Sequence, residues 1–118
     1  MSKQISYEEI GAVTVTFMAP SGVEDGMVVK LTADSTVGPC AAGEKFCGMS
    51  LTPVGGFAAV QVAGFAKVHF SGLGVTPGWL SLTADGAGGV KKATSGDGAG
   101  DYLVVSTDTA DSTAVVLL

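Results

Sequence analysis

The sequence predicts an all-β fold: a small antiparallel β-barrel or sandwich of about nine short strands, preceded by an N-terminal arm. Three observations support this prediction. Apolar and polar residues alternate with a period of two in several segments. Turn signals rich in Gly and Pro separate these segments at roughly 8–12-residue intervals. No segment combines capping residues with the apolar spacing of three and four residues that a helix requires.

The first strands follow from clear alternation. Residues 12–19 place Val and Phe against Thr and Met, a pattern that fits a pleated, half-buried surface. Pro20-Ser21-Gly22 and Asp25-Gly26 are turn sequences, and 27–31 forms the second expected strand. Residues 32–38 are expected to be a loop.

The middle of the chain is less regular. Residues 40–51 are ambiguous, and we expect a short strand at 45–49 within them. Residues 57–70 form the longest extended segment. Gly64 interrupts that segment at a point where a bulge or sharp bend would let one strand serve two sheets.

The C-terminal half continues as short strands joined by Gly-rich connections. A Gly/Pro loop at 71–78 comes first, and the sequence 85–89 is typical of a hairpin connection. A closing hairpin turns around residues 108–112. The strands expected here are 79–84, 90–94, 102–107 and 113–118.

Composition limits the class of protein. The chain has 118 residues, which predicts one β-domain at 12–118 after a flexible arm at 1–11. Its net charge is −5, with six Lys and no Arg, so a nucleic-acid partner is not expected. No apolar run reaches the roughly 18 residues of a membrane helix, so a membrane partner is not expected either. The N-terminus lacks the apolar core of a secretory signal, so we expect cytoplasmic synthesis.

No catalytic, cofactor or metal site is expected. His69 is the single His, no Gly-x-Ser-x-Gly elbow occurs, and His69 is expected on the polar face of a strand beside Lys67. Cys40 and Cys47 are not spaced as redox or zinc motifs are. We expect two free, partly buried thiols, with a local disulfide as the open alternative.

Two features suggest assembly. Only 14% of the residues are charged, so much of the surface must consist of small apolar and hydroxyl side chains. Few Lys or Pro residues lie inside the expected strands to protect sheet edges from pairing. Trp79 opens a strand and is either a core residue at one end of a barrel or an interface anchor.

The order of these features resembles small capsid decoration (head-stabilising) proteins of tailed bacteriophages and prophages. An arm precedes the Val13-Thr-Val-Thr strand and Ala19-Pro-Ser-Gly. The Val60-Gln-Val-Ala-Gly-Phe-Ala-Lys-Val strand and Gly78-Trp-Leu-Ser-Leu-Thr-Ala-Asp-Gly follow, before a Val-rich closing hairpin. The likeness covers nearly the whole chain and rests on hairpin turns and Val-rich strands.

The resemblance implies a structural virion protein with no enzymatic activity. Such a protein would bind the major capsid protein on the outer surface of the virion and assemble with its own copies, with a trimer expected. The arm residues Ile5, Tyr7 and Ile10 are then expected to contact the capsid. Phe57 and Trp79 are expected at the self-interface.

Other interpretations stay open. A phage tail, fibre or connector domain would share the same physics with a different partner. A small ligand- or carbohydrate-binding β-module would need an open cavity or an exposed aromatic platform. An enzyme would need a role for His69 or Cys47.

Overall fold

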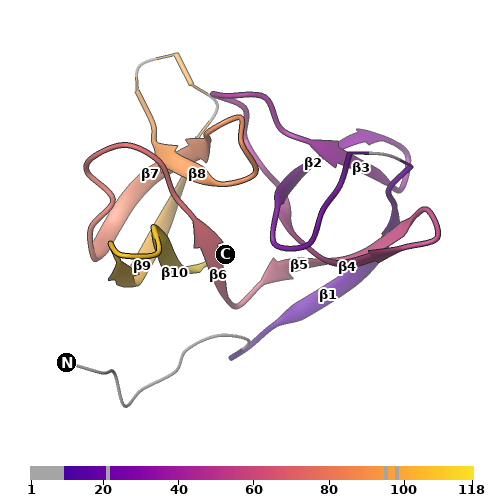
Figure 1. Ribbon diagram of the computed structural model, residues 1–118, viewed down its shortest axis with the longest axis horizontal. Helices are drawn as coiled ribbons and strands as arrows, with labels where there is room; N and C mark the ends of the chain where they lie inside the picture. Colours follow the sequence, from indigo (N-terminus) through magenta and orange to yellow (C-terminus); the bar gives the residue numbers. More distant parts are fainter. Residues whose placement is uncertain (1–9, 21, 95, 98) are drawn as a thin grey trace.

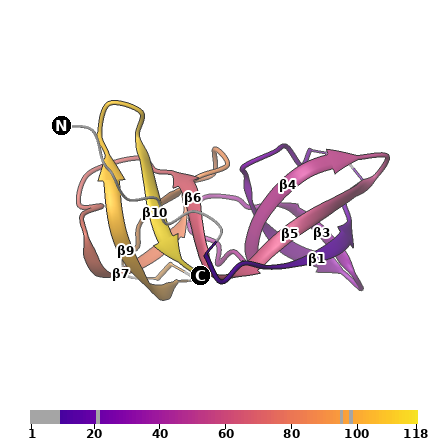
Figure 2. The ribbon, with the colours of Figure 1, turned by 90° about the horizontal axis from the view of Figure 1, so that it is seen from below.

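The all-β prediction is confirmed by a computed structural model, which describes residues 10–20, 22–94, 96–97 and 99–118. Ten strands form two five-stranded sheets that lie side by side along the long axis (Figures 1 and 2). No helix occurs within these ranges. The strands are β1 (Val13–Met18), β2 (Val28–Ala33), β3 (Thr36–Pro39), β4 (Gly48–Val54), β5 (Phe57–Ala63), β6 (Phe65–His69), β7 (Gly78–Ala84), β8 (Val90–Lys92), β9 (Gly100–Asp108) and β10 (Thr113–Leu117).

The first sheet is a small closed barrel with the strand order β1-β3-β2-β4-β5. Val29, Val37 and Val60 are completely or almost completely buried in its interior. The hairpin between β4 and β5 turns at Gly55-Gly56, and both residues have positive φ angles, of 61° and 84°. Two-residue hairpin loops with positive φ favour Gly, because a side chain would be strained there.

The second sheet has the order β6-β10-β9-β7-β8, and its two edges approach each other. Phe70, directly after β6, forms a parallel bridge with Val90 at the start of β8. Leu82, Val104 and Val116 are buried on the inner face of this curled sheet. The curled sheet therefore encloses part of an apolar core.

Gly64 joins the two sheets, as the sequence predicts. β5 ends at Ala63 in the barrel, and β6 begins at Phe65 in the second sheet. Gly64 has a φ of 89°, and a Cβ atom there would lie 2.5 Å from the carbonyl carbon of Gly11. Only Gly satisfies both the left-handed backbone and this close approach.

The barrel and the second sheet also share a core. One cluster of buried side chains includes Val28 and Met49 from the barrel strands and Leu82 from β7. Phe46 stacks on Tyr102 of β9, with ring centroids 5.0 Å apart. Nearby, the backbone N–H of Ala84 donates to the carbonyl of Glu44 at 3.0 Å, which fixes the 40–47 segment against β7.

Two elements differ from the prediction. The expected loop at 32–38 contains the end of β2 and the first three residues of β3, with a sharp turn at Asp34-Ser35 between them. The strand expected at 45–49 instead covers 48–54; before it, the backbone of residues 43–44 bonds to Ala84 of β7, and Cys47 donates to Val29 of β2. The unexpected strand β3 raises the count from about nine strands to ten.

Gln61 shows how the bend at Gly64 is stabilised. Sequence alternation groups this residue with the exposed Lys67 and His69, yet its side chain is buried. Its amide Nε2 donates to the carbonyls of Ala63, at 3.1 Å, and Phe65, at 2.9 Å. The buried amide is satisfied by the two residues that flank the bend, as buried polar groups require.

Candidate interaction surfaces

An exposed apolar cluster lies on the outside of the barrel. Phe57 is the cross-strand partner of Met18 on β1 and also of Val54 on β4, so the three side chains share one face. Phe57 is 54% exposed, and Met18 and Val54 are exposed as well. We call Met18, Val54 and Phe57 the hairpin patch.

A second apolar surface crosses four strands of the other sheet. Trp79 on β7 pairs with Leu103 on β9, Leu103 pairs with Leu117 on β10, and Leu117 pairs with Phe65 on β6. Direct cross-strand partners lie on the same face of a sheet. We call Trp79, Leu103, Leu117 and Phe65 the four-strand row.

Trp79 is not a core residue. Its side chain is 69% exposed, while its neighbours in the four-strand row are half-buried. Leu82, of the opposite parity on β7, takes the buried position instead. The core interpretation of Trp79 is therefore wrong, and its exposure is compatible with an interface position.

The structure does not bring Phe57 and Trp79 together. The β4–β5 hairpin lies at one end of the molecule, and β7 belongs to the sheet at the opposite end (Figures 1 and 2). The molecule extends 40 Å along its longest axis. Within one chain, the hairpin patch and the four-strand row are therefore two separate surfaces.

The expected capsid-contact arm is only partly described. Ile5 and Tyr7 lie outside the described residues. Ile10 is 55% exposed, and its carbonyl accepts a hydrogen bond of 3.0 Å from the backbone N–H of Phe65. This bond and the close contact of Gly11 with Gly64 fix the chain where it enters the described structure.

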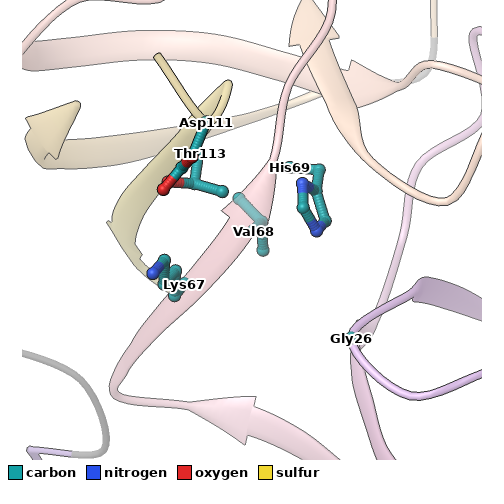
Figure 3. A pocket seen from close by; sticks show the side chains of 6 residues that line it. All are labelled: Gly26, Lys67, Val68, His69, Asp111 and Thr113. Carbon is teal, nitrogen blue, oxygen red and sulfur yellow. The ribbon is translucent and has the colours of Figure 1, made fainter. Parts of the chain in front are cut away.

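His69 lies on the exposed face of β6 with Lys67, as predicted. It lines an open groove of about 340 Å³ that runs from β6 to the turn between β9 and β10 (Figure 3). The ring lies on the side of β6 that faces the Gly26 loop. The groove is lined by Gly26, Lys67, Val68, His69, Asp111 and Thr113.

A smaller hollow of about 100 Å³ adjoins this groove and shares Gly26 and His69 with it. Glu24 and Asp25 also line it. In the part of the chain that the structure describes, no three His, Cys, Asp or Glu side chains are grouped so that they could hold a metal ion. The two hollows are open surface features with mixed polar linings.

Both cysteines are free thiols. Cys40 is buried and Cys47 is exposed, so neither thiol is partly buried as expected. Burial, and secondarily the negative charge of Glu44, raises the pKa of Cys40 to about 11. Because the thiolate is the reactive form of cysteine, Cys40 is a poor nucleophile near neutral pH.

Glu44 fixes the segment that carries these cysteines. Its carboxylate accepts a hydrogen bond of 2.7 Å from Lys30 Nζ and another of 2.7 Å from the backbone N–H of Ala41. These two bonds lower the pKa of Glu44, with the Lys30 bond as the larger cause. The Lys30–Glu44 ion pair is half-exposed, so it contributes little to the free energy of folding. Its main effect is to hold the 40–47 segment in place.

Comparisons with known proteins add no relative: no family model and no curated protein matches the chain. The described ranges also contain no helix long and apolar enough to cross a membrane.

Sequence reasoning missed most of both surfaces. It selected Phe57 and Trp79 but not the side chains that adjoin them on neighbouring strands. Alternation shows which residues of one strand share a face, whereas the neighbours depend on which strands pair and in what register. For Trp79, the alternation of Leu80 and Leu82 with Trp79 and Ser81 was a signal that favoured an outward position.

Proposed function

We propose that this chain is a structural protein that assembles with its own copies and coats the outer surface of a bacteriophage capsid. The observation that carries the proposal is the four-strand row, an apolar stripe that ends in a Trp side chain left 69% exposed. Trp is among the side chains most enriched at the energetic centres of interfaces. The family resemblance supplies the capsid as partner.

The hairpin patch and the four-strand row suit a contact between different faces of two copies. Because they lie at opposite ends, the patch of one copy can cover the row of the next. Contacts of this head-to-tail kind form a closed ring when the rotation between copies closes. A trimer is the ring size that the resemblance implies.

Stabilisation of the capsid would be thermodynamic. A protein that binds only the expanded shell stabilises that shell by mass action. Many symmetric copies add avidity, so each contact can be modest. The arm with Ile5, Tyr7 and Ile10 is the proposed capsid contact, and the bond between Ile10 and Phe65 holds its base on the second sheet.

The test uses expanded and unexpanded shells of the phage or prophage that encodes the chain. The purified protein should cosediment with expanded shells and raise the temperature at which they disrupt. A variant that lacks residues 1–9 keeps the Ile10–Phe65 hydrogen bond and the Gly11–Gly64 contact, so it should fold normally and bind the shells more weakly. Failure of the intact protein to cosediment with either shell would refute the capsid assignment.

A carbohydrate-binding module is a second candidate, because Trp79 is an exposed aromatic on a sheet face. Beside it, Ser81 Oγ donates to Asp101 Oδ1 at 2.6 Å, which places polar groups next to the ring. Saturable quenching of the fluorescence of the single Trp by oligosaccharides would favour this function. A tail or fibre domain would use the same surfaces to bind a different partner. Cosedimentation with purified phage tails instead of capsid shells would identify this function.

A further inference from the structure

The outer edge of β1 is open. On one side β1 pairs with β5 along its whole length. On the other side, among the described residues, only Met18 pairs, with Thr36 of β3. The barrel is thus closed by one residue pair, and the edge from Val13 to Phe17 has no strand beside it there.

The direction of the backbone groups identifies which residues can bond to a further strand. Met18 donates its N–H away from β5, to the carbonyl of Ser35 at 2.8 Å, whereas Ala19 donates to Gly56 beside β5 at 2.7 Å. The backbone N–H and C=O groups of successive residues in a strand point to opposite sides of that strand. Thr14 and Thr16 therefore direct their N–H and C=O groups to the open edge.

This edge lacks the features that normally prevent pairing. No charged residue occurs anywhere from Ile10 to Val23, and no Pro lies within β1. Charged side chains and Pro are the usual protection of an edge strand. An uncharged edge of alternating Thr and Val fits another uncharged strand.

The barrel interior is also exposed at this opening. Val15 is the partner of the fully buried Val60, yet it is 43% exposed. Leu31 is the partner of the buried Val37, yet it is 56% exposed. Among the described residues no strand lies beside Val13–Phe17, which leaves Val15 accessible; Leu31 lies on β2 beyond the residues that pair with β4.

We propose that β1 pairs with β1 of a second copy of this chain, antiparallel about a two-fold axis at Val15. In this register Thr14 of each copy lies opposite Thr16 of the other, and each such pair exchanges both main-chain hydrogen bonds. Val15 lies opposite Val15, and Val13 lies opposite Phe17.

The proposed register places like side chains together on each face of the joined sheet. Val, Phe and Val meet on the interior side, and Thr meets Thr on the outer side. Aromatic–β-branched and Thr–Thr pairs are favourable between adjacent strands. A self-complementary edge of this kind suits an isologous contact. The contact needs no capsid, and it uses neither the hairpin patch nor the four-strand row.

The first test is the variant Thr16→Pro, made in a Trp79→Ala chain so that contacts through the four-strand row are removed. Pro is tolerated where a strand N–H faces away from the sheet, so β1 should still pair with β5. The Trp79→Ala parent should dimerise reversibly in sedimentation experiments. Thr16→Pro should weaken that dimer by about 10-fold or more, since hydrogen bonds are lost at two symmetric positions.

The matched control is Thr109→Pro, in the turn between β9 and β10, where the parent dimer should be unchanged. A parent that stays monomeric up to about 1 mM, or a dimer that survives Thr16→Pro, would overturn the proposal. Loss of shell binding by Thr16→Pro without any change in self-association would assign the edge to a capsid strand instead.

Cysteine crosslinking tests the register without relying on a Pro variant. In a Cys47→Ser background, Val15→Cys should form a disulfide-linked dimer on mild oxidation, because facing residues of a non-hydrogen-bonded pair are close enough. Val13→Cys has similar exposure but lies opposite Phe17, so it should crosslink far more slowly. Equal crosslinking of the two variants, or none with Val15→Cys, would contradict the register.

Discussion

Replacing Trp79 with Ala should weaken self-association and leave the fold intact. The side chain is 69% exposed, so unfolding changes its environment little. A Trp side chain buries up to about 250 Å² in an interface, so the exposed part amounts to roughly 170 Å². At about 25 cal/mol per Å² this area corresponds to roughly 4 kcal/mol. Since about 1.4 kcal/mol is tenfold in affinity, a loss of about 4 kcal/mol is a weakening of roughly several hundredfold.

Sedimentation velocity over a range of concentrations measures this effect, with chemical denaturation as the check on folding. Leu73→Ala is the matched control, because Leu73 is an almost fully exposed apolar residue outside both candidate surfaces. Trp79→Ala should shift the assembly curve while Leu73→Ala leaves it in place. An unchanged curve for Trp79→Ala, or an equal shift for both variants, would refute the assignment of the four-strand row as an interface.

Three further predictions concern the fold. Leu82→Ala should lower the free energy of unfolding by about 3 kcal/mol in urea titrations, because it leaves a cavity under the second sheet; a loss below about 1 kcal/mol would contradict this burial. Gly64→Ala should destabilise the chain by at least about 1 kcal/mol, since Ala is strained at positive φ and its Cβ meets Gly11. Gly96→Ala is the control for the effect of positive φ alone, because a Cβ there meets nothing within 4 Å. Burial raises the pKa of Cys40 from 9.0 to about 11, so the folded state keeps this proton to a higher pH than the unfolded state does. The free energy of unfolding should therefore fall as pH rises from 9.0 to about 11. Cys40→Ala should lack this fall, and equal pH profiles of the two proteins would rule the effect out.

The strands that alternation predicts are the ones that the structure contains with small changes in their ends. Residues 12–19 became β1, and the long 57–70 segment divided at Gly64 into β5 and β6. These features are local, because a period of two and a Gly at a break follow from backbone geometry alone.

The features that were wrong depend on contacts between distant residues. β3 has four residues and one buried side chain, Val37, which is too little for a periodic signal. Phe46 was expected in a strand, but it lies before β4. There its ring is buried and stacks on Tyr102 of β9. Pairing across sheets overrides local preference at such positions.

The candidate surfaces were predictable only as single residues. The exposed position of Trp79 follows from its parity on β7, but Leu103, Leu117 and Phe65 adjoin it through three strand pairings that no local pattern fixes. The open edge of β1 likewise depends on where β3 meets it. Composition predicted that the chain would assemble. The surfaces that could make the contacts depend on which strands pair, and this is known only from the structure.

The mass of the intact chain in solution tests self-assembly most directly. Sedimentation equilibrium from micromolar to millimolar concentration should give a species at a multiple of 11.7 kDa, populated increasingly at higher concentration. A single species of 11.7 kDa throughout that range would contradict the claim that the exposed apolar surfaces of this protein exist to join it to further copies.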